Sequence, residues 1–237
     1  MFMKFANKRV LITGSAKRVG AALALAFAQQ GAKILLHFNC SRSEAEALLH
    51  TLPGTGHELL QADLSDATAV KQLFAQAGKV DILVNNASRY LTGTLLEETP
   101  AKDREQLEVN FWAPLELMRS FAGQGIEEGV IINFVDQEVL KTPRNGIYSL
   151  SRRMLADATL ELAAELGPLN IRVNAVAPGP VIPPPEFAAN GMKKTLPTLP
   201  LRRKVELDDL TGAVLFLAGN SSITGVILPV DCGQHLI

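Results

Sequence analysis

A tyrosine and an arginine four positions apart, Tyr148 and Arg152, could form a pair that transfers a proton. On a helix, positions i and i+4 lie on one face, so the phenol and the guanidinium can point into the same cleft. A phenol is a useful proton donor near neutral pH only if its pKa is lowered, and a neighbouring cation favours the phenolate. The alternative is a surface arginine beside a half-buried tyrosine. The choice between the two depends on the rest of the chain.

A glycine turn, Thr13–Gly20, directly follows a short apolar run and leads into a helical pattern. Backbone N–H groups of such a turn, together with the N-terminus of the helix, can face a pyrophosphate. The spacing differs from the G-x-G-x-x-G of ordinary dinucleotide folds, so a turn that only packs helix against strand remains an alternative. The residues of the turn that we expect at a cofactor are Gly14, Ser15, Lys17, Arg18, Val19 and Gly20.

Short β-rich runs alternate with longer segments of helical periodicity along the whole chain. The runs are Val10–Ile12, Ile34–Phe38, Leu59–Leu60, Ile82–Val84, Val130–Phe134, Ile171–Val176 and Val226–Val230. The helical segments include Ala21–Gln29, Ala67–Ala77, Glu105–Phe121, Ser149–Leu166 and Leu207–Leu217. This alternation predicts an α/β fold: a single-domain, Rossmann-type, doubly wound parallel seven-stranded sheet over residues 1–237, with helices on both faces. Pro229 has no N–H to donate, which favours an edge position for the last run.

The composition favours a small-molecule site. The net charge is −1 and no long basic block occurs, so we expect no nucleic-acid or membrane partner. No stretch approaches about 18 consecutive apolar residues, and the first residues lack the pattern of a signal peptide, so we expect a cytoplasmic protein. Cys40 and Cys232 have no metal-ligand spacing with the histidines. We therefore expect no metal, and we expect His37 and the other histidines to be surface or packing residues.

The end of the second β-rich run bears on the choice between NADP and NAD. An acidic side chain there would bind the adenosine ribose and repel a 2′-phosphate, but the position holds Asn39, followed closely by Ser41 and Arg42. Lys17 and Arg42 can supply cationic donors and Ser41 a hydroxyl. The alternative is that both cations are solvated surface charges. We expect NADP(H) as the cofactor.

Several motifs, in order along the chain, resemble the short-chain dehydrogenase/reductase family from end to end. Besides the glycine turn and Tyr148 they are Ala62-Asp63-Leu64, Asn85-Asn86-Ala87-Ser88, Asn110 and Pro178-Gly179-Pro180-Val181. The resemblance implies that Asp63 and Leu64 hold the adenine. It implies that Asn86, Ala87 and Ser88 support the cofactor, and that Pro178, Gly179 and Val181 border the nicotinamide.

The same resemblance gives roles to two further residues. Arg152 stands where the family keeps a lysine that hydrogen-bonds the nicotinamide ribose, so Arg152 is expected to contact the ribose and support Tyr148. Asn110 is expected to kink its helix and thereby place a water in the proton relay. Its alternative role is the kink alone, because an asparagine side chain competes for backbone hydrogen bonds.

Three details narrow the resemblance: Lys17-Arg18 within the glycine turn, Ser88 at the end of its motif, and Asp136 where relatives commonly have serine. The combination is similar to the pteridine reductases and the dihydromonapterin (dihydrofolate) reductases. It implies that Tyr90 stacks on a pterin, that Arg18 and Ser88 hydrogen-bond this substrate, and that Asp136 and Tyr148 deliver the proton. The alternatives are that Asp136 caps the following turn and that Tyr90 packs on its neighbours.

The expected activity is NADPH-dependent reduction of a C=N bond in a dihydropterin or dihydrofolate. The proline-rich stretch 178–200 is expected to form a substrate loop or lid, and the resemblance implies a homotetramer. Two other functions remain open. One is a generic carbonyl or 3-oxoacyl reductase, against which Asp136 speaks, and the other is an NADP-binding protein whose catalysis is impaired by arginine at position 152.

Overall fold

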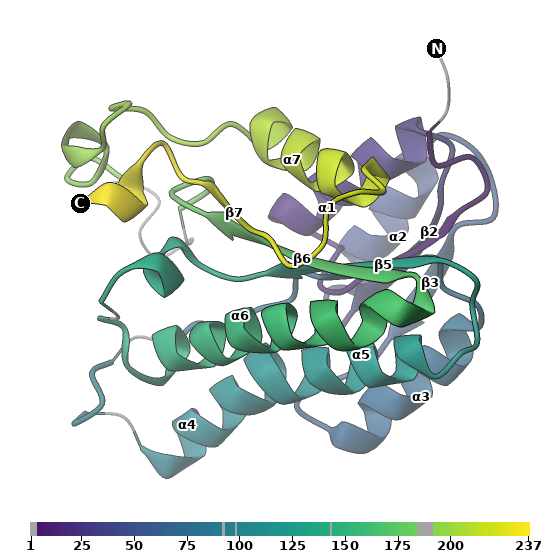
Figure 1. Ribbon diagram of the computed structural model, residues 1–237, viewed down its shortest axis with the longest axis horizontal. Helices are drawn as coiled ribbons and strands as arrows, with labels where there is room; N and C mark the ends of the chain where they lie inside the picture. The colour runs from purple at the N-terminus through teal and green to yellow at the C-terminus, as the bar shows by residue number, and fades with distance from the viewer. Residues whose placement is uncertain (1–3, 92, 98, 143, 184–191) are drawn as a thin grey trace.

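Seven parallel strands form one sheet in the order β3-β2-β1-β4-β5-β6-β7 (Figure 1). The computed structural model describes residues 4–91, 93–97, 99–142, 144–183 and 192–237. Each β-rich run of the sequence corresponds to a strand, and β7 lies at the edge, as Pro229 predicted. The predicted doubly wound sheet is confirmed. The strands are β1 Arg9–Ile12, β2 Lys33–Phe38, β3 Glu58–Gln61, β4 Ile82–Asn85, β5 Gly129–Phe134, β6 Ile171–Pro178 and β7 Ile227–Val230.

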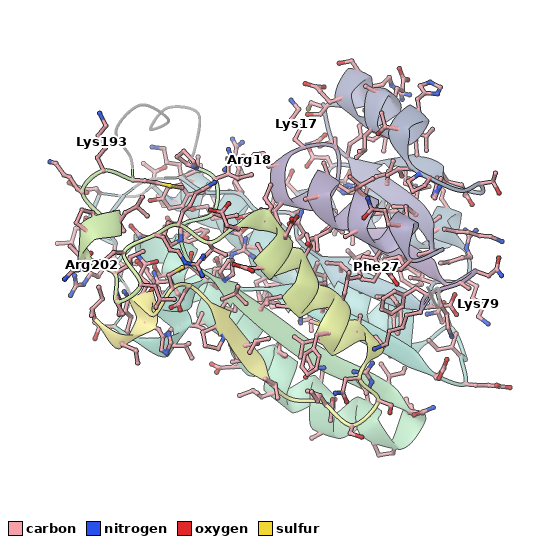
Figure 2. All side chains as sticks on the ribbon, turned by 90° about the horizontal axis from the view of Figure 1, so that it is seen from above. Lys17, Arg18, Phe27, Lys79, Lys193 and Arg202 are labelled. Atoms are coloured by element: carbon pink, nitrogen blue, oxygen red, sulfur yellow. The ribbon has the colours of Figure 1, made fainter. Side chains whose placement is uncertain are left out.

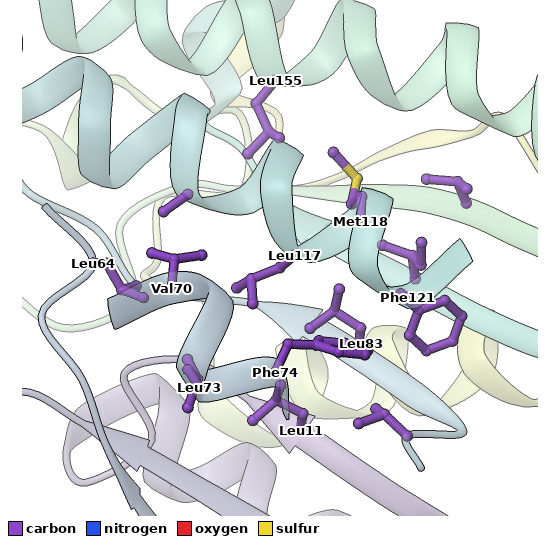
Figure 3. Close-up of a cluster of buried hydrophobic side chains, with 14 of the residues drawn as sticks. Leu11, Leu64, Val70, Leu73, Phe74, Leu83, Leu117, Met118, Phe121 and Leu155 are labelled. Atoms are coloured by element: carbon purple, nitrogen blue, oxygen red, sulfur yellow. The ribbon is translucent and has the colours of Figure 1, made fainter. Parts of the chain in front are cut away.

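Helices cover both faces of this sheet (Figure 1). On one face lie α1 Arg18–Gln29, α2 Arg42–Thr51 and α7 Leu207–Gly219; on the other lie α3 Ala67–Ala77, α4 Pro100–Leu107, α5 Ala113–Ala122 and α6 Gly146–Leu166. Because successive side chains of a strand point to opposite faces, Val10 and Ile12 pack under α1 and α7, whereas Leu11 joins the cluster under α3 and α5. Figure 3 shows that second cluster.

One helical prediction needs correction, and one helix was not predicted. The segment predicted as one helix over Glu105–Phe121 consists of α4, a π-helical turn at Glu108–Trp112, and α5. The cause is Asn110, whose buried side chain binds backbone outside the helix, as described below. Helix α2 is absent from the named segments because its sequence is mostly polar and buries only Ala45. Among the described residues, no helix is long and apolar enough to cross a membrane.

The starts of two helices place the candidate chemistry. Helix α1 begins at Arg18, within the glycine turn, and α6 begins at Gly146, so Tyr148 lies in its first turn. All strands are parallel, and their carboxyl ends therefore meet at one edge of the sheet. The loops that leave this edge carry the candidate residues.

Candidate active site

A cleft with two adjoining hollows runs along the carboxyl edge of the sheet. The first hollow, here the cofactor half, has a volume of about 690 Å³ and lies between the glycine turn and the ends of β2, β3 and β4. The second, here the reaction half, has a volume of about 560 Å³ and lies between the end of β5, the start of α6 and the loop after β6. Both are lined by Arg18, Val19, Asn86 and Ser88, so the two halves are continuous.

The glycine turn is held closely against the end of β4. Gly14 has a φ of +64°, a conformation that favours glycine. A Cβ atom on Gly20 would lie 2.3 Å from the Gly14 carbonyl oxygen. The Asn86 side-chain amide donates to the carbonyl oxygens of Thr13 and Gly14 at 2.8 and 3.2 Å. The turn is thus fixed by backbone and amide contacts, and Asn86, predicted to support the cofactor, supports the turn.

His37 holds the same turn from the other side. Its Nδ1 accepts a hydrogen bond from the Gly14 N–H at 3.0 Å, and its Nε2 lies 3.1 Å from the Ala62 carbonyl oxygen. Burial lowers the pKa of His37 to about 4, so the ring is neutral at physiological pH, with the proton on Nε2. Sequence reasoning gave His37 no role beyond packing. The signal that was missed is its place in the strand next to β1, close to the end that faces the turn.

Two predicted cofactor residues lie apart from the cleft surface. Ser15 is buried beneath the turn, where its N–H and hydroxyl donate to the His37 carbonyl oxygen at 2.9 and 3.3 Å. Arg42 is not among the residues that line the cofactor half: it lies 2.6 Å from the Gln61 Oε1 atom and pairs with Glu46 at 3.5 Å. Ser15 thus supports the turn from beneath, whereas Arg42 makes its contacts at the surface outside the cofactor half.

The other predicted residues of the cofactor half do line it. They include Gly14, Lys17, Val19, Gly20, Asn39, Ser41, Asp63, Leu64, Ala87 and Ser88. Lys17 forms an ion pair with Glu44 at 2.6 Å. Asp63 accepts hydrogen bonds from the Ser65 N–H and hydroxyl at 2.9 and 2.7 Å, which lower the pKa of the Asp63 carboxyl. A charged acceptor thus faces the place expected for the adenine.

The predicted pair of Tyr148 and Arg152 comes together in the reaction half. The Arg152 guanidinium carbon lies 5.5 Å from the centre of the Tyr148 ring. Arg152 is only 2% exposed, which excludes the surface arginine considered as the alternative. Its Nη1 donates to the Phe134 carbonyl oxygen at 3.2 Å, whereas its Nε is buried without a hydrogen-bond partner in the described part of the chain. An unpaired buried donor in a cleft is a group that a ligand can satisfy.

Tyr148 also contacts the predicted acid. Its hydroxyl donates to Asp136 Oδ2 at 3.2 Å, while Asp136 Oδ1 accepts the Glu138 N–H at 2.9 Å. Asp136 thus both faces Tyr148 and caps the 3-10 helix η2, Gln137–Leu140. Removal of water raises the pKa of Asp136 and also that of Tyr148, where the Asp136 charge adds to the effect and Arg152 opposes it. The expected lowering of the Tyr148 pKa by Arg152 is therefore outweighed.

Tyr90 and Asn110 lie around the pair of Tyr148 and Asp136 and hold its surroundings in place. The Tyr90 ring lies edge-on to the Tyr148 ring, with centroids 4.8 Å apart and an interplanar angle of 82°. Asn110 is buried; it accepts the Arg89 N–H and donates to the Arg89 carbonyl oxygen, both at 2.8 Å, and donates to Ser151 Oγ at 3.2 Å. It thereby fixes the loop that carries Ser88 and Tyr90. Within the described residues no hydrogen bond joins Asn110 to Tyr148.

The loop after β6 closes the reaction half. Pro178, Gly179 and Val181, the residues expected to border the nicotinamide, line it. Arg18 has a φ of +56° and donates to the carbonyl oxygens of Ile182 at 2.7 Å and Pro183 at 3.1 Å. Figure 2 shows Lys17 and Arg18 at the start of α1. Of the predicted lid 178–200, residues 184–191 lie outside the described residues.

The arrangement fits a nicotinamide dinucleotide. A tight glycine turn that lines the cleft precedes a helix N-terminus, an acidic group lies at the end expected for the adenine, and an unpaired guanidinium Nε lies at the other end beside Tyr148. The described residues contain no group of three His, Cys, Asp or Glu side chains that could hold a metal ion. The site can therefore bind a hydride donor and supply a proton.

Comparisons with known proteins agree with this geometry. A family model described as enoyl-(acyl carrier protein) reductase matches residues 14–235. L-xylulose reductase of Bos taurus is 32% identical over 243 residues, covering 98% of each chain. The crystal structures of FolM alternative dihydrofolate reductase 1 from Brucella canis and from Brucella suis, both with NADP, each align with a TM-score of 0.91 at 33% identity, covering 100% of this chain and 97% of theirs.

A parallel sheet in this strand order, with a glycine turn and a tyrosine–arginine pair at its carboxyl edge, defines a dinucleotide-dependent oxidoreductase. The chain belongs to the short-chain dehydrogenase/reductase family. The prediction of a nicotinamide cofactor is confirmed, since this family uses NAD(P). The names of the relatives include both a sugar reductase and a dihydrofolate reductase, so membership alone leaves the substrate open.

Proposed function

We propose that the protein is an NADPH-dependent reductase of a pteridine-type substrate and reduces a C=N bond of a dihydropterin or dihydrofolate. The contact between the Tyr148 hydroxyl and the Asp136 carboxyl, 3.2 Å apart, is the observation that carries this proposal. A carboxyl group with a raised pKa retains its proton at higher pH, so Asp136 can act as the proton source behind Tyr148. The similarity to the dihydrofolate reductases of Brucella supports the same substrate class.

Tyr148, Asp136 and Arg152 then each have a defined role in the reaction. NADPH, when bound, supplies the hydride to the ring carbon of the C=N bond. Tyr148 donates the proton to the ring nitrogen and is reprotonated from Asp136, so that the substrate gains one hydride and one proton. Arg152 stabilises negative charge on the phenol and, through its unpaired Nε, holds the nicotinamide ribose.

The remaining predicted substrate contacts follow from the walls of the reaction half. Arg18, Ser88 and Tyr90 all line it. A pterin is flat and carries donors and acceptors along its edge, so it needs one aromatic surface and a few polar groups. Arg18 and Ser88 supply the polar groups, and Tyr90 supplies the aromatic surface once its ring is free to face the substrate.

The assay that tests this function is NADPH oxidation with dihydropterin, dihydrofolate, acetoacetyl thioester and L-xylulose as separate substrates. We expect turnover of a pteridine, and its loss in Tyr148→Phe with unchanged NADPH binding by fluorescence. Turnover of the thioester or the sugar alone would identify a carbonyl reductase, which the curated sugar reductase relatives favour. NADPH binding without turnover of any substrate would identify a binding protein.

We also propose a cytoplasmic homotetramer. The support is apolar side chains that are exposed on the described chain: Trp112 on the π-helical turn, Leu160 on α6 and Phe216 on α7. Exposed apolar area of this kind often marks an interface between subunits. The free thiols of Cys40 and Cys232 fit a reducing compartment. Light scattering should give four times the chain mass of 25.5 kDa, and a mass of one chain at micromolar concentration would contradict the proposal.

A further inference from the structure

A second carboxylate, Glu138, borders the reaction half and has no part in the chemistry described so far. It is only 9% exposed. One of its oxygens accepts from the Asn145 side-chain amide at 2.6 Å, and the other accepts a short hydrogen bond from the Ser149 hydroxyl and a longer one from the Arg144 N–H at 3.4 Å. All three partners donate, so the hydrogen bonding suits a deprotonated carboxylate.

No cation balances this carboxylate in the part of the chain that the structure describes. Lys141 donates to the carbonyl oxygens of Gln234 and Ile237 at 3.1 and 3.2 Å, and Arg153 donates to the Lys141 carbonyl oxygen at 3.1 Å. A buried carboxylate held only by neutral donors is destabilising compared with an apolar group of similar size.

Glu138 joins the two segments that carry the proton donor and the acid. Its backbone N–H holds Asp136 Oδ1, and its carboxylate holds Ser149, the residue after Tyr148 in the first turn of α6. The hydrogen bond between Tyr148 and Asp136 joins the same two segments, the start of η2 and the first turn of α6. Loss of the Glu138 carboxylate would therefore release the first turn of α6 from η2, and with it the alignment of the phenol.

The charge of Glu138 also acts on Asp136. Removal of water and the negative charge of Glu138 raise the pKa of Asp136, whereas Arg152 and the hydrogen bonds from the Glu138 N–H and from Tyr148 lower it. The raising effects prevail. Glu138 therefore favours the protonated form of its neighbour.

We propose that Glu138 is a positioning residue for the reduction, a role that rests on the proposed function: its carboxylate holds the first turn of α6 against η2, and its negative charge acts on the neighbouring Asp136. The two parts of this role are separable by substitution. Glu138→Gln keeps the size of the side chain and one acceptor oxygen, which can still serve Ser149 and Arg144, and removes the charge and the acceptor for Asn145. Ser149→Ala keeps the charge and removes one contact, and Glu138→Asp keeps the charge on a shorter side chain that cannot reach all three donors.

The first experiment is the pH profile of kcat/KM for NADPH-dependent dihydropterin reduction. Activity needs protonated Asp136, so it falls as pH rises through the pKa of that group. In Glu138→Gln we expect the pH at which kcat/KM falls to be lower by about one unit, and kcat/KM at still lower pH to be near that of the wild type. In Ser149→Ala and Glu138→Asp we expect a several-fold lower kcat and an unmoved profile. A kcat/KM of Glu138→Gln that is lowered by the same factor at every pH would overturn the proposal.

The second experiment needs no substrate, which separates this proposal from the proposed function. Infrared difference titration of the holoprotein with NADPH follows the Asp136 carboxyl, assigned by its loss in Asp136→Asn. We expect Glu138→Gln to lower its midpoint by about one pH unit and Ser149→Ala to leave it in place. An unchanged midpoint in Glu138→Gln overturns the role of Glu138. A shifted midpoint without dihydropterin turnover overturns only the proposed substrate. If Glu138→Gln does not fold, a midpoint displaced in Glu138→Asp overturns the role.

Discussion

The two halves of the cleft are held by different kinds of interaction. In the cofactor half, neutral groups fix the glycine turn: the Asn86 amide, the His37 imidazole and backbone N–H groups. Its charged side chains face solvent, as in the pair of Lys17 with Glu44. In the reaction half Glu138 and Arg152 lie inside the protein, and Arg152 is the largest fully buried side chain among the described residues, whereas Arg18, which borders both halves, is exposed.

This difference implies that the cofactor half depends mainly on the shape of its backbone and the reaction half mainly on its charges. A turn fixed by neutral hydrogen bonds and close backbone contacts keeps its shape as long as His37 is neutral, so at neutral pH the cofactor half should respond mainly to changes of volume. Buried charges respond to protonation and to each other, because water does not screen them. The reaction half should therefore respond mainly to changes of charge and pH. The following variants test that division.

The largest effect is expected from Arg152. Arg152→Ala removes the cation beside the Tyr148 ring and should lower turnover 10²-fold or more, on the order of 3 kcal/mol in the transition state. Arg152→Lys keeps the charge and should be roughly neutral. The measurement is single-turnover reduction of a dihydropterin. An inactive wild type that lysine restores would instead favour the binding protein with impaired catalysis.

His37 provides a pH test of the cofactor half. The unfolded chain takes up a proton at this histidine below about pH 6.5, but the folded protein does so only near pH 4. Stability is therefore lost as pH falls from about 6.5 to 4, by roughly 2–3 kcal/mol from this group. Urea unfolding over this range should show the loss, and His37→Asn should show less of it. Parallel curves for the two proteins would refute the assignment of a neutral ring.

Gly20→Ala tests the tight packing of the turn. Its Cβ would lie 2.3 Å from the Gly14 carbonyl oxygen, so the backbone must move, at a typical cost of about 1–3 kcal/mol. We expect NADPH to bind at least tenfold more weakly, about 1.4 kcal/mol, by calorimetry. The control is Gly212→Ala in α7, where nothing lies within 4 Å of the new Cβ. Equal affinities in the two variants would show that the turn is not held as tightly as described.

The smallest effect concerns the preference for NADPH over NADH, expected to be at least tenfold, about 1.4 kcal/mol. Lys17 lines the cofactor half and Arg42 does not, so Lys17→Ala should reduce the preference more than Arg42→Ala. Calorimetry of the wild type and both variants with each cofactor gives the six dissociation constants needed. Equal constants for the two cofactors in the wild type would contradict the preference itself, and a larger loss in Arg42→Ala would reverse the assignment.

The strands could be predicted from the sequence because each buried strand is a local run of apolar residues. The edge position of β7 could be predicted because Pro229 is itself a local signal. What could not be predicted depends on distant partners. The role of His37 depends on the Gly14 N–H, and that of Asn110 on the Arg89 backbone, 21 positions away. Helical periodicity likewise says nothing of the direction of an exposed side chain such as Arg42.

The centre of the reaction half shows the same limit. Spacing predicted that Tyr148 and Arg152 share a face, and the structure brings them together. The balance of effects on the Tyr148 pKa was not predictable, because it depends on how much water the folded chain removes. Glu138 was also missed, since its three donors come from the start of α6 and not from its own strand or helix.

The π-helical turn at Glu108–Trp112 sets a rule for insertions and deletions in this chain. A π turn contains one residue more than an α turn, so it acts as a single-residue insertion within a continuous helix. Deleting one residue there would rotate α4 by about 100° relative to α5. Gln106, which accepts the Leu91 N–H at 3.0 Å, and the buried Leu117 could then no longer both face inward. Surface loops can change length, but in this helix the loss of even one residue would turn a buried side chain away from the interior.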